Sequence, residues 1–193
     1  MKTFKFVGAS ELTKEDLLHI GQLLLEAEYC DRAKVTRAYN SYSAKSDGLL
    51  QIITPYLTHT KVLMDKESVV GFFIATTKCS IRKISRKISG WRKNDQELMS
   101  CLNFYKQEAL DSDFILHDII IEPKYRGLGL FKMLKNYLVE LAKKNLCQRI
   151  VFLVNASNPA MNVYKHYGAK EIGAIDPRKM HASDRLIKCY FAI

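Results

Sequence analysis

The sequence predicts a single α/β domain whose mixed β-sheet has about six or seven strands flanked by helices. Two apolar runs, residues 60–64 and 69–75, flank a short polar turn, which is typical of an antiparallel hairpin. Two later runs, 113–121 and 149–154, enclose a helical pattern, which indicates a parallel pair with a right-handed crossover. With 193 residues and 48% hydrophobic content the chain can bury one sizeable core, so we expect one domain over residues 1–193.

The first half of the chain predicts one strand and two helices before the hairpin. Residues 4–7 alternate weakly and suit a first strand. Thr13 can cap a helix whose first turn is acidic and whose apolar stripe begins at Leu17. A second helical stretch is expected from about Ser43 to Tyr56, interrupted by Pro55. These helices would cover one side of the sheet.

A basic helical insertion is expected at about residues 79–111, between the hairpin and the next strand. Ile81, Ile84 and Ile88 recur at helical spacing among lysines and arginines. A basic face of this kind suits an anionic partner, namely RNA, an acidic protein or a membrane surface. The alternative is a helix or loop whose isoleucines pack on the domain and whose charges are solvated.

The second half of the chain alternates strands and helices and ends with two strands. We expect these elements at residues 113–121, 129–144, 149–154, 158–167, 169–175 and 185–193. Pro123 ends the first of these strands because proline cannot continue the ladder of hydrogen bonds. We expect the last two strands to close the sheet as an antiparallel pair.

Composition excludes several classes of protein. No apolar run approaches the ~20 residues of a membrane span, and the N-terminus lacks the pattern of a secretory signal, so a cytoplasmic location is expected. The five cysteines and five histidines are scattered, which predicts reduced thiols and no metal site. The net charge of +10 favours an anionic partner without identifying it.

The segment from Tyr125 to Leu130 joins a buried strand to an amphipathic helix through two glycines. Gly127 and Gly129 would let backbone amides approach a ligand, and the helix N-terminus adds partial positive charge, so an anion site is predicted. Arg126 could contact the anion or hold the loop in shape. A nucleotide-binding Gly-Lys-Ser/Thr loop and a dinucleotide-binding third glycine are both missing.

This segment resembles the signature of the GNAT superfamily of acetyltransferases, (Arg or Gln)-x-x-Gly-x-(Gly or Ala) after the fourth strand. Arg126 and Gly129 match it, and Phe131 departs from it by occupying the Gly or Ala position. Residues 155–169 resemble the family's block after the fifth strand, with Ala169 in place of an aromatic residue. The resemblance covers roughly residues 114–175 and implies a GNAT-like sheet with splayed parallel strands 4 and 5, and an N-acetyltransferase activity.

The resemblance also implies a site for acetyl-CoA, with no metal. Its pantetheine arm would pair with the backbone of the fourth strand at Ile119, Ile120 and Ile121. Its pyrophosphate would lie on the loop and first helical turn, at Arg126, Gly127, Leu128, Gly129, Leu130, Phe131 and Lys132. Asn158 would help to hold the pantetheine arm, or would cap the following helix.

The acceptor implied by the resemblance is a primary amine of a small molecule or a protein, and the enzyme would be a monomer or a homodimer. An alkyl ammonium with a pKa of about 10.4 must lose a proton before it attacks, so a base is expected. Asp118 is preferred over His117, and the two face opposite sides of the strand. Tyr164 matches the family's proton donor to the departing thiolate, or is a packing residue. The competing hypothesis is a non-catalytic protein that binds acyl-CoA, or one that binds nucleic acid through the basic insertion.

Overall fold

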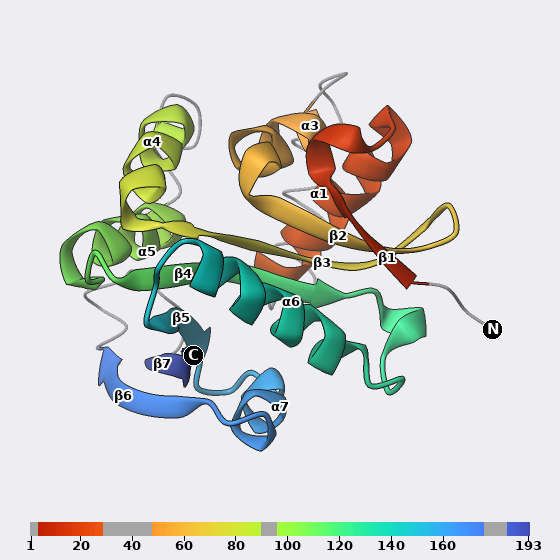
Figure 1. The fold of residues 1–193 in the computed structure, drawn as a ribbon. Helices are drawn as coiled ribbons and strands as arrows, with labels where there is room; N and C mark the ends of the chain where they lie inside the picture. Colours follow the sequence, from red (N-terminus) through yellow and green to blue (C-terminus); the bar gives the residue numbers. More distant parts are fainter. Residues whose placement is uncertain (1–3, 29–47, 90–95, 176–184) are drawn as a thin grey trace. The chain divides into compact units, whose positions relative to one another are not determined.

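The computed structural model describes residues 4–28, 48–89, 96–175 and 185–193. The described residues form a seven-stranded mixed sheet in the order β1-β2-β3-β4-β5-β7-β6, in which β4 and β5 are parallel (Figure 1). The predicted mixed sheet is therefore confirmed. The chain divides into two compact units, which we call unit 1 (residues 1–74 and 118–134) and unit 2 (residues 75–117 and 135–193).

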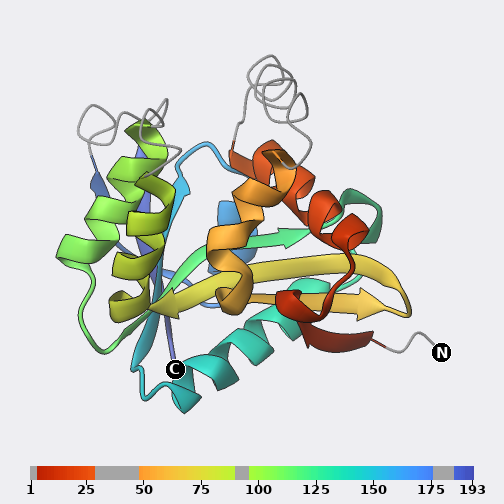
Figure 2. The same ribbon diagram turned by 90° about the horizontal axis from the view of Figure 1, so that it is seen from above.

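Unit 1 contains an antiparallel three-stranded meander and the helices of the N-terminal half. Its elements are β1 (Phe4–Gly8), α1 (Lys14–Glu28), α3 (Gly48–Ile53), β2 (Thr60–Asp65) and most of β3 (Ser68–Thr77), with short 3-10 helices at Ala9–Glu11 and Thr54–His59. Helix α1 begins where predicted, because the Thr13 hydroxyl accepts a hydrogen bond from the Asp16 amide. Helices α1 and α3 lie side by side in both views (Figures 1 and 2).

Two sequence predictions in unit 1 can be compared directly with the structure. The hairpin is confirmed: Asp65 pairs with Ser68, and Lys66 in the turn has a positive φ of 55°. The helix expected at about 43–56 is an α-helix only to Ile53 and continues as a 3-10 helix around Pro55, which lacks the amide that an α-helical bond needs. Residues 43–47 of that prediction lie outside the described residues.

Unit 2 contains the remaining helices and the C-terminal strands. Its elements are α4 (Lys78–Ser89), α5 (Gln96–Glu108), β5 (Arg149–Asn155), α7 (Ala160–His166), β6 (Lys170–Ile175) and β7 (Leu186–Ala192). Three elements belong partly to each unit, namely β3, β4 (Asp113–Ile121) and α6 (Leu130–Lys144). Strand β7 pairs antiparallel with both β5 and β6, so the last two strands form the antiparallel pair that was predicted.

Helix α4 buries its apolar stripe within unit 2. Ile81, Ile84 and Ile88 are each no more than 2% exposed, and the basic side chains between them are exposed. Helix α5 lies beside α4 (Figure 2), and Lys106 Nζ donates to Ser85 Oγ at 3.3 Å. The interpretation in which the isoleucines pack on the domain is confirmed. In the part of the chain that the structure describes, no helix combines the length and apolar character of a membrane-spanning segment.

The start of the parallel pair is anchored by a buried carboxylate. Asp113 is fully buried, and its Oδ2 accepts from the Leu110 amide at 2.7 Å and from Arg149 Nη2 at 3.2 Å. Arg149 Nε donates to the other carboxylate oxygen. Because Asp113 begins β4 and Arg149 begins β5, this ion pair fixes the register of the two strands.

We therefore predict that Asp113→Ala lowers the free energy of unfolding by about 3 kcal/mol, because a buried amide and a guanidinium lose their acceptor. Urea denaturation measures this change. The matched control is Asp111→Ala, because Asp111 is exposed and its ion pair with Lys78 Nζ is long at 4.0 Å. This variant should leave the free energy of unfolding nearly unchanged. Equal destabilisation by both variants would contradict the anchoring role.

Candidate active site

The turn between β4 and α6 requires its two glycines for their backbone conformation. Gly127 and Gly129 have φ angles of +79° and +72°, in the left-handed region that favours glycine. A Cβ atom at either position would meet nothing within 4 Å. The glycines are thus not needed to avoid a protein neighbour, and the space beside the turn is open to a ligand.

The backbone amides of this turn point to an anion-binding function. In the described part of the chain, the N–H groups of Gly127, Leu128, Gly129 and Leu130 donate to no protein acceptor. They precede the 15-residue helix α6, whose N-terminus carries partial positive charge. The Lys132 amide differs, because it donates to the Gly129 carbonyl at 3.1 Å, but the Lys132 side chain is exposed.

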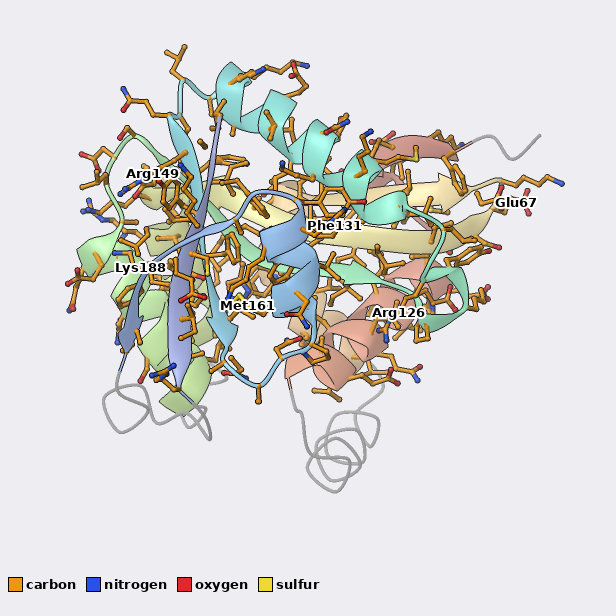
Figure 3. The ribbon with its side chains drawn as sticks, turned by 90° about the horizontal axis from the view of Figure 1, so that it is seen from below. Glu67, Arg126, Phe131, Arg149, Met161 and Lys188 are labelled. Atoms are coloured by element: carbon orange, nitrogen blue, oxygen red, sulfur yellow. The ribbon has the colours of Figure 1, made fainter. Side chains whose placement is uncertain are left out.

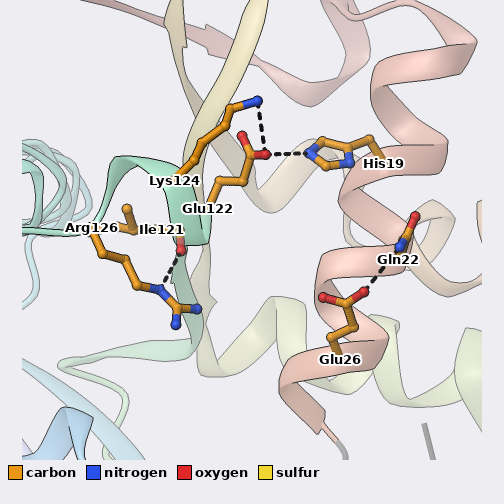
Figure 4. A network of polar contacts seen from close by, with 7 residues as sticks. All are labelled: His19, Gln22, Glu26, Ile121, Glu122, Lys124 and Arg126. Carbon is orange, nitrogen blue, oxygen red and sulfur yellow. Dashed lines mark hydrogen bonds and ion pairs between the residues drawn. The ribbon is translucent and has the colours of Figure 1, made fainter. Parts of the chain in front are cut away.

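Arg126 braces the start of this turn. Its Nε donates to the carbonyl oxygen of Ile121 at 3.1 Å, and its own amide donates to Pro123 (Figure 4). Arg126 thus bonds to the backbone that precedes the turn, and its contact with an anion stays a prediction. Its exposed guanidinium keeps further N–H donors, which are the groups that recognise phosphate.

Phe131 lies in the first turn of α6 and is 8% exposed, so its side chain packs into the core and not over the glycine turn (Figure 3). This burial explains how a large residue replaces the family's Gly or Ala. Leu130 is also buried, whereas Leu128 is 55% exposed at the tip of the turn. The departure at Phe131 therefore leaves the anion site open.

The end of β4 lies close to β3 within unit 1. The Glu122 amide donates to the Val70 carbonyl at 3.0 Å, and a Cβ at Gly71 would lie 2.7 Å from the Ile120 carbonyl oxygen. Asp118 is half-buried, as is Ile119. By the alternation of a strand, Asp118 and Ile120 share the face of Glu122, and Ile119 and Ile121 occupy the other.

Glu122 is a site-adjacent carboxylate that the sequence interpretation did not single out. Its Oε1 lies 3.0 Å from Lys124 Nζ and 3.8 Å from His19 Nε2 of α1 (Figure 4). Its Oε2 is buried and has no hydrogen-bond partner among the described residues. The hydrogen bond to Glu122 raises the pKa of Lys124. The sequence around Glu122 does not predict this network, because the network needs His19 of α1, which is distant in the sequence.

Tyr164 lies on α7 in unit 2 and is half-buried. Its ring meets the Phe152 ring of β5 edge-on, with centroids 5.2 Å apart. Helix α7 ends in a Schellman motif, in which the Gly168 amide donates to Lys165 and the Ala169 amide to Tyr164, and Gly168 has a φ of +88°. Lys135 Nζ, which the sequence interpretation also missed, donates to the Tyr167 carbonyl at 2.7 Å and further closes this helix end.

Asn158 precedes α7, and its side-chain oxygen accepts from the Ala160 amide at 2.9 Å. The N-cap of α7 is Pro159, so Asn158 bonds to the first helical amide from one residue before the cap, and its contact with pantetheine stays a prediction. The structure thus brings Asp118, Ile119–Ile121 and Arg126–Lys132 together in unit 1, and places Asn158 and Tyr164 in unit 2. Among the described residues, no three His, Cys, Asp or Glu side chains form a group that could hold a metal ion.

The described residues form an α/β fold in which a turn with two left-handed glycines joins β4 to α6. Comparison with known proteins identifies the class more closely. The family model described as "Acetyltransferase (GNAT) family" matches residues 54–169. The chain belongs to the GNAT acetyltransferase family, whose members are acyl-CoA-dependent enzymes.

Solved structures share the fold across nearly the whole chain. A putative GNAT acetyltransferase from Desulfovibrio desulfuricans superposes with a TM-score of 0.61 at 10% identity, covering 100% of this chain and 99% of that one. The PaiA N-acetyltransferase from Thermoplasma acidophilum, in complex with coenzyme A, superposes with a TM-score of 0.60 at 11% identity, covering 99% of both chains. Ard1 from Thermoplasma volcanium superposes with a TM-score of 0.55 at 12% identity, covering 99% of this chain and 97% of that one. The comparison with curated proteins found no match.

We predict that Gly129→Ala weakens coenzyme A binding by about tenfold, because a left-handed residue with a Cβ costs roughly 1–2 kcal/mol and distorts the turn. Isothermal titration calorimetry measures the affinity. Gly173→Ala is the matched control, since a Cβ there also meets nothing within 4 Å but its φ is not left-handed. Loss of affinity in the control alone would place the anion site elsewhere.

Proposed function

We propose that this protein transfers the acetyl group of acetyl-CoA to a primary amine by direct attack. The observation that carries the proposal is the turn of unpaired amides at Gly127–Leu130 before α6, in a chain of the GNAT family. Bound acetyl-CoA supplies the thioester that the amine attacks. The coenzyme A bound to the Thermoplasma acidophilum neighbour supports the same ligand for this fold.

Two regions of unit 1 would hold the cofactor. The amides of Gly127 to Leu130 and the exposed Arg126 and Lys132 side chains suit the pyrophosphate, which carries negative charge. The strand backbone of Ile119–Ile121 suits the pantetheine arm, whose amides can pair as an added strand would. An amide at Ile119 or Ile120 would polarise the thioester carbonyl.

Two side chains would move protons. Asp118 would accept the proton of the acceptor ammonium, directly or through water, so that a neutral amine attacks. Tyr164 would donate its phenolic proton to the departing sulfur of coenzyme A. The edge-on contact with Phe152 supports this role, because it restrains the Tyr164 ring.

The test is an acetyl-CoA-dependent assay over a panel of primary amines, with Tyr164→Phe as the diagnostic variant. We expect Tyr164→Phe to lower kcat on the accepted amine by about a hundredfold at unchanged affinity for acetyl-CoA, because only the proton donor is lost. Tyr167→Phe, three residues further on, should keep wild-type kcat. If Tyr164→Phe retains full activity, the proton-donor role is wrong; if acetyl-CoA fails to bind, the proposed function is wrong.

We further predict that Asp118→Asn lowers kcat/KM by about a hundredfold near neutral pH. The defect should shrink as the pH rises toward the amine pKa of about 10.4, where the acceptor deprotonates without help. A pH profile of kcat/KM for both proteins measures this. His117→Asn is the control on the opposite face of the strand, and a larger loss there than in Asp118→Asn would transfer the role of base to His117.

A further inference from the structure

The exposed side of helix α4 is basic from residue 82 to residue 87. The isoleucines of the opposite side are buried within unit 2, so the orientation of the helix about its axis is fixed. Four exposed residues lie on the outward side, and we call them the basic face: Arg82, Lys83, Arg86 and Lys87. The whole of α4 contains no acidic residue. The positive charge of this helix is therefore concentrated on the one side that a partner can reach.

Most of the basic face is not neutralised by acidic neighbours. Arg82, Lys83 and Lys87 take part in no ion pair in the part of the chain that the structure describes. At the start of the helix, Asp111 Oδ1 lies 4.0 Å from Lys78 Nζ, so this carboxylate is paired outside the basic face. Lys106 of α5, the helix beside α4 (Figure 2), donates to Ser85 and adds a further positive charge.

The basic face consists of two parallel rows of cations. Residues four apart in an α-helix lie on one side of it, about 6 Å apart along the axis. Arg82 therefore lines up with Arg86, and Lys83 lines up with Lys87. Successive residues are separated by about 100° around the axis, so the two rows flank the outward line of the helix. Such a face is complementary to two lines of negative charge.

The composition of the basic face disfavours three kinds of anionic partner. A membrane-binding helix inserts an apolar side into the bilayer, but the isoleucines of α4 are buried in the protein. A protein interface is centred on apolar or aromatic side chains, and none belongs to the basic face. Single-stranded nucleic acid is bound by stacking on aromatic rings, which this face also lacks.

The major groove of B-form DNA is bordered by two lines of phosphates. This groove is about 12 Å wide and admits an α-helix, which measures about 10–12 Å across with its side chains. The major groove of A-form RNA is too narrow for a helix. A helix lying along the DNA groove would direct its arginine row to one strand and its lysine row to the other, while its buried side remains on unit 2.

We propose that the basic face of α4 binds the phosphate backbone of double-stranded DNA without selecting a base sequence. Contacts from lysine and arginine to phosphates release counterions, which gives an affinity that falls steeply with salt. This binding goes beyond acetyl transfer and does not depend on it, because the regions assigned to the cofactor at Ile119–Ile121 and Arg126–Lys132 belong to unit 1 and α4 belongs to unit 2.

The test is the fluorescence anisotropy of a labelled DNA duplex of about 20 base pairs, or two helical turns, titrated with the full chain at several salt concentrations. Four phosphate contacts predict a slope of about −3.6 for the logarithm of the binding constant against that of salt. Lys83→Gln/Lys87→Gln removes one row, so the slope should become about −1.8 and binding at low salt at least about tenfold weaker. Lys83→Arg/Lys87→Arg keeps the charges and should bind as the wild type does.

The matched control is Lys143→Gln/Lys144→Gln, because both lysines are exposed at the end of α6 within unit 2 and the net charge changes equally. The control should bind DNA as the wild type does. An equal loss in the control, or no binding of the duplex by the wild type, would overturn the proposal. Tighter binding to an RNA duplex of the same sequence, or to phosphatidylserine vesicles, would overturn the choice of DNA. Coenzyme A binding, measured by calorimetry, should be the same in the α4 variant and the wild type, so a failure of the proposed function is detected separately.

Discussion

The need of buried backbone groups for hydrogen-bond partners shapes the region around β4. A parallel ladder that stops inside a protein leaves amides and carbonyls without partners, which costs too much to be tolerated repeatedly. Here pairing with β5 covers only residues 113–115 opposite 149–151, and the Tyr105 hydroxyl takes the next amide and carbonyl. The buried Asp113–Arg149 ion pair fixes the other end of this short ladder. The ion pair and the Tyr105 hydrogen bonds together determine where β4 and β5 are paired and where their pairing ends.

The glycine turn differs from the β4–β5 ladder, because its backbone amides are left without protein acceptors. Four successive amides have no protein acceptor in the described part of the chain, and the backbone is held open by two left-handed glycines and by Arg126 on the Ile121 carbonyl. A loop that leaves several donors exposed at a helix N-terminus is favourable only with water or an anion in place. Phe131 does not disturb this arrangement, because its side chain is buried in the first turn of α6, while Leu128 lies before the helix and remains exposed.

Much of the fold and part of the site could be predicted from periodicity and turn chemistry, because these are local properties. Strand alternation, the isoleucine stripe of α4 and the cap at Thr13 each depend on residues within one element. The glycine turn is predicted by Gly127 and Gly129 themselves. Tyr105 could not be found this way. At helical spacing with Leu98 and Leu102 it indicates only a packing residue, and its hydroxyl acquires a role when residues 11 and 48 positions away are brought to it. Glu122 was missed for the same reason, since its network needs His19 of α1.

Cofactor binding and acceptor choice therefore rest on different kinds of interaction. The cofactor would be held mainly by backbone groups, whose positions follow from φ angles and strand pairing and are insensitive to most substitutions. Of the cationic side chains nearby, Lys124 is paired with Glu122 and Arg126 Nε is bonded to the Ile121 carbonyl, so the remaining Arg126 donors and the exposed Lys132 would add to the backbone contacts. The acceptor, by contrast, must be chosen by side chains. On the Glu122 face of β4 these include carboxylates, even though the chain as a whole carries a net charge of +10. Helix α4 alone carries five lysine and arginine residues and no acidic one, so half of the net charge comes from a single helix of unit 2 and says little about the charge around β4.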